Sequence, residues 1–244
     1  MHSISLMFPV YGDELTVRPL TEKAIDMFAR LGCEYEIVIV DDGSPDRSGE
    51  IADDLDREYD CVKVIHHPVN KGYGAAVRAG LAACTKDFVC LTDGDDQYDV
   101  YDLPKLLKLI DYYPLVITFR YKKIYSTTRM FISWMYNVVL RFLFRTHFRD
   151  VSTGLRLVKR SLLDDIYLES NSPVIGAELS IKAMLKGYPV GEVGIQTFPR
   201  VFGKGGSTSM KNIMATIKEM LQIYGKIFSQ DYDLPSSGER KAKK

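Results

Sequence analysis

The sequence predicts an α/β fold, an open sheet with helices on both faces, and three observations lead to it. Short apolar runs alternate with helix-patterned segments along the first half of the chain, and this order is typical of right-handed βαβ units. At 244 residues and 46% apolar content, the chain can bury one full core. Polar motifs follow the apolar runs, and ligands of such sheets bind beyond the carboxyl ends of the strands. We therefore expect these motifs to converge on one crevice.

The elements of residues 1–120 are assigned in order from this alternation. Strands are expected at the apolar runs rich in β-branched residues, and helices at the longer segments between them. The expected strands are 4–8, 36–40, 62–65, 87–91 and 115–119, and the expected helices are 14–31, 47–58, 74–84 and 102–111.

The pattern of residues 126–148 predicts one long helix or two, with apolar and aromatic side chains on most of the helix circumference. A buried helix with a solvated edge and a helix lying on a membrane surface are both open interpretations. The longest charge-free run extends only from Met130 to Leu140, well short of the roughly 20 residues that span a bilayer. The polar side chains recur at every fourth position and form one stripe: Arg129, Ser133, Asn137, Arg141 and Arg145.

The chain is expected to form one catalytic-type domain with a C-terminal extension. Residues 1–205 make the domain, including the basic and aromatic helices of 120–150. Apolar residues at heptad spacing in 206–229 predict an amphipathic helix that packs on the domain or on a partner subunit in a homo-oligomer. The polar segment 230–244 is expected to be disordered, with a basic end suited to anionic lipid.

Composition excludes several classes of protein. The four cysteines show no CxxC pair or zinc-ligand spacing, so we expect reduced thiols in a cytoplasmic protein. The N-terminal segment lacks the features of a signal peptide. Acidic side chains dominate residues 1–100, whereas 120–160 is strongly basic with Asp150 as its single acid. This asymmetry indicates a cation site at one end and an anionic partner at the other.

The stretch LTDGDDQYD, residues 91–99, crowds four carboxylates after an apolar run. Two carboxylates about 4 Å apart repel by roughly 1 kcal/mol in water and about 4 kcal/mol near a protein surface. Asp93, Asp95 and Gln97 alternate, so extended backbone points them to the same side. Three oxygen ligands on one side suit Mg²⁺ or Mn²⁺. An EF-hand is excluded, because the positions that need Gly and Glu hold Tyr98 and Pro104.

Two further motifs are weak when taken singly. The segment VDDGSPDRSGE (40–50) turns from a strand into a helix and fits an ordinary βα turn as well as a ligand loop. The segment NKGYGAAVRAG (70–80) offers Lys71 and free backbone N–H groups to an anion at a helix start. It matches neither a Walker loop nor a dinucleotide-binding turn.

Taken together, the motifs resemble those of inverting family-2 glycosyltransferases with the GT-A fold, a Rossmann-like open mixed sheet. The resemblance covers roughly residues 4–205 and is closest to the dolichol-phosphate mannose synthase and polyprenyl-phosphate glycosyltransferase branch. The strings that carry it are FPVYGDE, VDDGSPDRS, HHPVNKGYGAAVRAG, TDGDDQYD, RMFISWMYN and DVSTGLRLVKR.

The resemblance implies a donor site for a GDP- or UDP-linked sugar. Asp42 would accept a hydrogen bond from the base, Tyr11 would offer it an apolar face, and Asp93 and Asp95 with Gln97 would hold Mg²⁺ or Mn²⁺ on the diphosphate. Arg200 would belong to a loop that closes over the diphosphate, where the motif GKGGSTS departs from the family's usual serine-lysine pair. The nucleotide-binding residues implied are Pro9, Tyr11, Glu14, Asp42, Lys71 and Asp93.

The resemblance also implies an acceptor site for a polyprenyl phosphate at the cytoplasmic face of a membrane, with the protein bound peripherally. Its implied residues are Arg120, Arg129, Ser133, Asp150 and Arg156. For Asp150, a plain structural salt bridge is an equally open interpretation. The motif DVSTGLR departs from the family's usual DPTSGFR, which bears on the acceptor more than on the donor.

Catalysis is expected to depend mainly on the cation at Asp95 and on Arg200, because the leaving diphosphate gains charge. A lipid phosphate is already a nucleophile at neutral pH, since its second pKa is about 6. A hydroxyl acceptor such as a glycan would instead need a base, and Glu178 in GAELSIKA is the candidate, with a helix N-terminal charge as its structural alternative. A non-catalytic nucleotide-sugar or nucleic-acid binding module is the alternative from another class. The basic segment carries no RNA-reading signature, so no nucleic-acid partner is expected.

Overall fold

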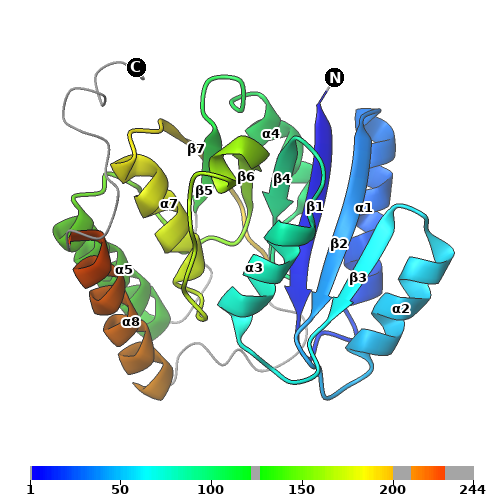
Figure 1. Ribbon diagram of the computed structural model, residues 1–244, viewed down its shortest axis with the longest axis horizontal. Coiled ribbons are helices and arrows are strands. Elements are labelled where there is room, and N and C mark those ends of the chain that lie inside the picture. The colour runs from blue at the N-terminus through cyan, green and yellow to red at the C-terminus, as the bar shows by residue number, and fades with distance from the viewer. Residues whose placement is uncertain (1, 122–126, 200–209, 229–244) are drawn as a thin grey trace.

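A computed structural model describes residues 2–121, 127–199 and 210–228 (Figure 1). In this part of the chain, seven strands form one mixed sheet in the order β3-β2-β1-β4-β6-β5-β7. The strands are β1 (Ser3–Val10), β2 (Glu34–Asp41), β3 (Val62–His66), β4 (Phe88–Leu91), β5 (Leu115–Arg120), β6 (Arg156–Lys159) and β7 (Val190–Ile195). The helices are α1 (Val17–Leu31), α2 (Ser48–Glu58), α3 (Tyr73–Ala83), the 3₁₀ turn η1 (Val100–Asp102), α4 (Leu103–Leu107), α5 (Thr127–Phe144), α6 (Arg160–Leu163), α7 (Ile175–Leu185) and α8 (Met210–Phe228).

Strand direction divides the sheet. The strands β1 to β4 pair in parallel, as their helical crossovers require. The strand β6 is antiparallel to both β4 and β5, and β7 pairs in parallel with β5. All five predicted strands are confirmed and the sheet is mixed, as expected. The sequence pattern does not predict β6 and β7, because they lie in a region without a regular alternation of strand and helix patterns.

Two apolar layers sandwich the sheet, because successive strand residues point to opposite faces. In β2, Ile37 and Ile39 face one layer, while Val38 and Val40 face the other. The helices α1, α2 and α4 cover the first face, and α3, α5, α7 and α8 cover the second (Figure 1). The predicted helices are present, although α4 ends at Leu107, earlier than the expected 111.

The helices α5 and α8 lie side by side at one end of the molecule (Figure 1). The ring of Phe144 contacts the rings of Tyr224 at 5.6 Å and Phe228 at 6.5 Å between centroids. The helix α8 therefore packs on its own domain, and a partner subunit stays a prediction. No helix in the described part of the chain combines the length and apolarity needed to cross a membrane.

The helix α5 is neither fully buried nor fully exposed. Asn137 and Leu140 are buried against the domain, whereas Trp134 and Phe142 are 56% and 85% exposed. The polar stripe expected from the sequence is thus split, because its middle member, Asn137, faces inward. The outward face carries large apolar side chains instead.

Candidate active site

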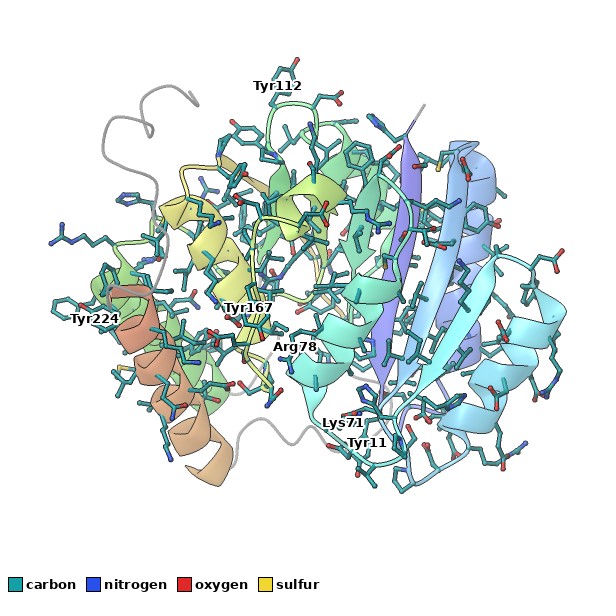
Figure 2. The ribbon with its side chains drawn as sticks, in the orientation of Figure 1. Tyr11, Lys71, Arg78, Tyr112, Tyr167 and Tyr224 are labelled. Carbon is teal, nitrogen blue, oxygen red and sulfur yellow. The ribbon has the colours of Figure 1, made fainter. Side chains whose placement is uncertain are left out.

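The polar motifs meet at one edge of the sheet, beyond the carboxyl ends of β1, β2, β3 and β4. Tyr11 and Lys71 both lie at this edge (Figure 2). Three hydrogen bonds join motifs that are distant in the sequence: Glu14 N to Asp46 Oδ2 at 3.2 Å, Lys71 N to Asp42 Oδ1 at 2.9 Å, and Thr16 Oγ1 to Gly94 O at 2.7 Å. The predicted convergence on one region is confirmed.

Asp93 and Asp95 follow β4, and each is held by its own hydrogen bonds. The hydroxyl of Tyr73 donates to Oδ1 of Asp93 at 2.6 Å. Gln97 donates to both oxygens of Asp95, with its backbone N–H at 3.2 Å from Oδ1 and its side-chain amide at 2.6 Å from Oδ2. Burial and the nearby charge of Asp95 raise the pKa of Asp93 to about 6. The two carboxylates are therefore held together despite their repulsion.

This pair of carboxylates fits a divalent cation. Oxygen ligands suit Mg²⁺ and Mn²⁺, which usually take one or two carboxylates and complete their shell with phosphate oxygens and water. Among the described residues, no group of three or more His, Cys, Asp and Glu side chains is placed to hold a metal ion. The role of Asp93 and Asp95 as ligands of such a cation stays a prediction. Gln97 holds Asp95 in this structure, and its role as a direct metal ligand stays a prediction.

The loop before β6 lies directly against Asp93. A β-carbon at Gly154 would lie 2.6 Å from Cγ of Asp93, so only glycine permits this approach. Gly94 has a similar constraint, since its β-carbon would lie 2.6 Å from the carbonyl oxygen of Pro9. Sequence reasoning did not single out Tyr73 or Gly154. Their signal was present in the NKGYG and DVSTG strings, but spacing alone does not show which residue they contact.

The residues expected to bind the nucleoside occupy the edge near β1. Pro9 is buried, Tyr11 is 49% exposed, and Glu14 is half-buried. Oε2 of Glu14 accepts from the backbone N–H of Arg47 at 3.2 Å. Lys71 is exposed at the same edge. The exposed ring of Tyr11 is suited to stack on a base, and these four roles stay predictions.

Asp42 organises the loop that follows β3. It is 3% exposed, and its Oδ1 accepts from the backbone N–H of Lys71 at 2.9 Å and lies 2.7 Å from Nδ1 of His67. Its Oδ2 accepts from the N–H of Gly72 at 2.9 Å. The carboxylate thus already holds two backbone donors and contacts an imidazole. The expected hydrogen bond from a base to Asp42 stays a prediction.

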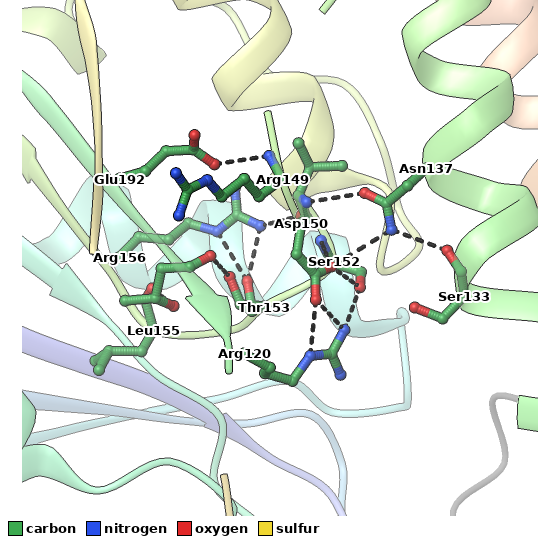
Figure 3. A network of polar contacts seen from close by, with 12 residues as sticks. Arg120, Ser133, Asn137, Arg149, Asp150, Ser152, Thr153, Leu155, Arg156 and Glu192 are labelled. Atoms are coloured by element: carbon green, nitrogen blue, oxygen red, sulfur yellow. Dashed lines mark hydrogen bonds and ion pairs between the residues drawn. The ribbon is translucent and has the colours of Figure 1, made fainter. Parts of the chain in front are cut away.

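Arg120 and Asp150 lie together beside α5 (Figure 3). Nε of Arg120 is 2.8 Å from Oδ2 of Asp150, and its Nη2 donates to the hydroxyl of Ser152 at 2.6 Å. Asn137 joins this pair to α5, because its amide donates to the carbonyl of Ser133 at 2.8 Å and its Oδ1 accepts from the N–H of Val151 at 3.1 Å. The structural salt bridge considered for Asp150 is thus present, and Asp150 orients Arg120.

Arg156 is not an acceptor-binding residue in this structure, which corrects the sequence-based expectation. Its side chain is 2% exposed, and it donates to the carbonyl of Val151 at 2.7 Å and the hydroxyl of Ser180 at 2.9 Å. A β-carbon at Gly176 would overlap the guanidinium. Arg156 therefore holds the loop before β6 against α7, where a phosphate has no access.

Glu178 is also corrected, because it is placed as a structural residue and not as a general base. It is 0% exposed and forms an ion pair with Lys182 at 2.7 Å. It accepts from the backbone N–H groups of Glu169 at 3.0 Å and Ser170 at 2.9 Å. A base must reach the proton it removes, and a fully buried carboxylate with these donors does not reach an acceptor.

Comparison with known proteins assigns the chain to a family. A family model described as "Glycosyl transferase family 2" matches residues 5–167. The chain belongs to glycosyl transferase family 2. This confirms the family named from the motifs and its class, a glycosyltransferase.

Two relatives of this family-2 chain carry names that specify an acceptor. It is 32% identical over 200 residues to a "Dolichyl-phosphate hexose transferase" of Haloferax volcanii, covering 77% of this chain and 84% of the relative. It is 30% identical over 167 residues to an "Undecaprenyl-phosphate 4-deoxy-4-formamido-L-arabinose transferase" of Pseudomonas fluorescens (strain SBW25), covering 67% of this chain. The chain spans about half the length of that relative, 49%.

Solved structures confirm the fold of this family-2 chain. Glucosyl-3-phosphoglycerate synthase from Mycobacterium tuberculosis, in complex with phosphoglyceric acid, matches with a TM-score of 0.69 at 18% identity, over 97% of this chain and 82% of that one. The same synthase in complex with Mn²⁺, uridine diphosphate and glucosyl-3-phosphoglycerate matches with a TM-score of 0.70 at 19% identity, over 97% and 82%. At such low identity the likeness shows the GT-A fold alone.

Two of the residues that the family resemblance implies have side chains outside the described part of the structure. Arg200 lies outside the described residues, as do 206–209 and the expected tail, 230–244. Arg129 belongs to α5, but its side chain is outside the described ones. Ser133 is half-buried in α5, one turn from Asn137. The acceptor roles of Arg129 and Ser133 and the closing role of Arg200 in this family-2 chain stay predictions.

Proposed function

We propose that this family-2 chain transfers a sugar from a nucleoside diphosphate sugar to a polyprenyl phosphate, with inversion at the anomeric carbon and with Mg²⁺ or Mn²⁺. The observation that carries the proposal is the pair Asp93 and Asp95 at the carboxyl end of β4, each held by separate hydrogen bonds. Carboxylates fixed in this way beside exposed Tyr11 and Lys71 suit the diphosphate and base of a GDP- or UDP-linked donor.

The donor half of the reaction requires the leaving diphosphate to gain charge. A bound Mg²⁺ or Mn²⁺ would supply Lewis-acid stabilisation of that charge. Asp93 and Asp95 would hold the ion, and Gln97 keeps Asp95 oriented. Lys71, at the same edge of the sheet, adds a positive charge that favours binding of the donor. Arg200 is proposed to add a second one during the reaction.

The acceptor half is supported by the relatives whose names specify dolichyl and undecaprenyl phosphate. A phosphate monoester attacks the anomeric carbon through its own oxygen, and in-line attack opposite the leaving diphosphate inverts that carbon. Since the second phosphate pKa is about 6, no protein base is needed at neutral pH. The burial of Glu178 is consistent with this chemistry. The ion pair of Arg120 with Asp150 is proposed to shape the acceptor site from below its surface, because only 6% of the Arg120 side chain is exposed.

The outward face of α5 supports peripheral binding to a membrane surface, where such an acceptor resides. Trp134, Met135, Val138 and Phe142 are 56%, 43%, 36% and 85% exposed. They occupy one face of the helix at spacings of one to four residues. Arg141 is also exposed on this helix. A helix with exposed aromatic side chains and cations suits an anionic lipid interface.

The hydroxyl-acceptor alternative is weakened by the structure, because the base that it required, Glu178, is enclosed. The non-catalytic alternative is weakened by the intact pair Asp93 and Asp95 and by the family match. Neither alternative is favoured by a specific observation.

A panel of nucleotide sugars tests the proposal. The full chain is incubated with GDP- or UDP-linked hexoses, a short polyprenyl phosphate, and Mg²⁺ or Mn²⁺, and the lipid fraction is analysed by mass spectrometry. We expect a polyprenyl phosphate sugar that disappears when EDTA is added. Parallel reactions replace the lipid phosphate with a polyprenol or an oligosaccharide. Product in those reactions alone would overturn the proposed acceptor.

A further inference from the structure

Tyr73 lies outside the carboxylate motif, yet it makes a direct contact with it. It is the first residue of α3, and its hydroxyl donates to Oδ1 of Asp93 at 2.6 Å. Asp95 is held by Gln97, two residues away in the same loop. Asp93 is held instead from a different element of the fold. The two carboxylates of the site are thus fixed by independent contacts.

We propose that Tyr73 is a positioning residue that fixes the carboxylate of Asp93 for binding of a divalent cation and a nucleoside diphosphate. This inference rests on the proposed function and deepens it. Gly154 also packs against the carboxylate of Asp93. Its backbone lies so close that a side chain at this position would overlap Asp93. The hydroxyl of Tyr73 contacts one oxygen of this carboxylate, and Gly154 lies against the group, so both contacts favour the orientation seen in the structure. Without the hydroxyl, the carboxylate loses the hydrogen bond that favours that orientation.

Two hydrogen bonds hold the start of α3 in place. They therefore fix the position of the Tyr73 hydroxyl relative to Asp93. On one side, Oδ2 of Asp42 accepts from the N–H of Gly72 at 2.9 Å. On the other, the N–H of Gly74 donates to the carbonyl of Asn171 at 3.0 Å. The φ angle of Gly72 is +94°, and a β-carbon there would lie 2.6 Å from that same carbonyl oxygen, so glycine is required.

The side chain of Arg78 strengthens this anchor one turn further along α3. It donates to the carbonyl of Ser170 and, at 2.6 Å, to Oδ1 of Asn171. The backbone of Ser170 is in turn held by Glu178 at 2.9 Å. These contacts make the α3 start a rigid support, which is the condition for a tyrosine to orient a metal-binding carboxylate. They also connect Asp42, at the nucleoside edge, with Asp93 through two consecutive residues of one turn, Gly72 and Tyr73.

The Tyr73→Phe variant tests the proposal, because it removes one hydroxyl and keeps the ring. Binding of Mn²⁺ to the full chain is measured by electron paramagnetic resonance with UDP or GDP present. Loss of an outer hydrogen-bond partner typically weakens metal affinity by about 10-fold to 100-fold, and we expect a loss of about 10-fold. In turnover assays, KM for the donor should rise while KM for the polyprenyl phosphate is unchanged. A general structural defect would move both constants.

Tyr188→Phe is the matched control. The hydroxyl of Tyr188 also donates to a carboxylate, Oδ2 of Asp165 at 2.8 Å, away from the candidate site. This variant should bind Mn²⁺ as the unaltered chain does. Thermal unfolding of both variants separates any loss of folding from loss of binding.

An Asp93→Asn background gives a second, independent measurement. If Tyr73 acts through Asp93, Tyr73→Phe should cause no further loss of UDP or GDP affinity in that background. Additive losses would overturn the proposal. Equal Mn²⁺ affinity of Tyr73→Phe and the unaltered chain would overturn it as well, while leaving the proposed function intact. Absence of Mn²⁺-dependent nucleotide binding in the unaltered chain would instead overturn both.

Discussion

Arg120 and Asp150 form a buried ion pair, with 2.7 Å between Nη2 of the arginine and Oδ2 of the aspartate. Their side chains are 6% and 3% exposed, so each charge depends on the other for compensation. Ser152 and Asn137 supply the neighbouring hydrogen bonds. The pair connects β5 with the loop before β6 and with α5, and it therefore links stability to the proposed acceptor site.

Asp150→Ala should lower the free energy of unfolding by about 3 kcal/mol, because it removes the carboxylate that compensates the charge of a buried arginine. It should also raise KM for the polyprenyl phosphate without weakening UDP or GDP binding. Urea denaturation and steady-state kinetics measure the two effects. Asp165→Ala is the control, since its ion pair with Lys186 is at the surface and should change stability by less than about 1 kcal/mol. Equal effects of the two variants would contradict the role of the pair.

Asp95→Asn should abolish Mg²⁺- or Mn²⁺-dependent transfer while leaving folding intact, because it removes one of the two negative charges proposed to hold the cation. The expected loss of kcat is at least about 100-fold. The neighbouring Asp96→Asn provides the control: Asp96 points to Lys23 at 2.5 Å, and asparagine tolerates its positive φ of 54°. Undiminished turnover of Asp95→Asn would contradict the proposal that Asp95 binds the metal ion.

Glu178→Gln should retain transfer to polyprenyl phosphate and lose stability. The substitution breaks the buried ion pair with Lys182, which costs about 3 kcal/mol, but it removes no group that the proposed reaction uses. Activity is measured below the melting temperature of the variant. An inactive variant that keeps its fold would point to a hydroxyl acceptor and to a base at this position.

Acid should destabilise the protein partly through Glu36 in β2. Burial opposes its ionisation, but hydrogen bonds from Lys63, Ser5 and Thr85 outweigh burial and lower the pKa from 4.5 to about 2. A pKa that is lower in the folded state contributes stability that is present above pH 4.5 and is lost as pH falls toward 2. The unfolding free energy of Glu36→Gln should therefore depend less steeply on pH between 4.5 and 2 than that of the unaltered chain. Parallel pH curves would refute this assignment.

Phe142→Glu should weaken binding to vesicles that contain anionic lipid. The side chain of Phe142 is 85% exposed on α5, and burying a phenylalanine in an apolar phase contributes about 2 kcal/mol. Co-sedimentation with vesicles measures the bound fraction. Tyr112→Glu is a matched control, since Tyr112 is 77% exposed and lies away from α5 (Figure 2). If both variants bind equally well, α5 is not the membrane surface.

The place of the donor-side motifs at one edge of the sheet was predictable because their signals are local, whereas the roles of their residues stay predictions. Asp93, Asp95 and Gln97 alternate within one loop, and the loop follows an apolar strand whose carboxyl end is known from the alternation of elements. The acceptor side was predicted less well. Arg156 and Glu178 have the right residue types for a phosphate site and a base, but burial decides their roles, and burial depends on packing between distant segments.

The sequence by itself determined the five strands from 4–8 to 115–119, the helices between them, the edge of the sheet where the motifs meet, and the family. Each of these follows from periodicity or from contiguous motifs, because the spacing of apolar side chains along a short segment indicates its secondary structure. Only the tertiary structure decided that β6 enters antiparallel between β4 and β5, that Asp42 holds the loop after β3, and that Tyr73 holds Asp93. These contacts join residues that are distant in sequence. They depend on how separate elements pack together, and such packing produces no periodic pattern in the sequence.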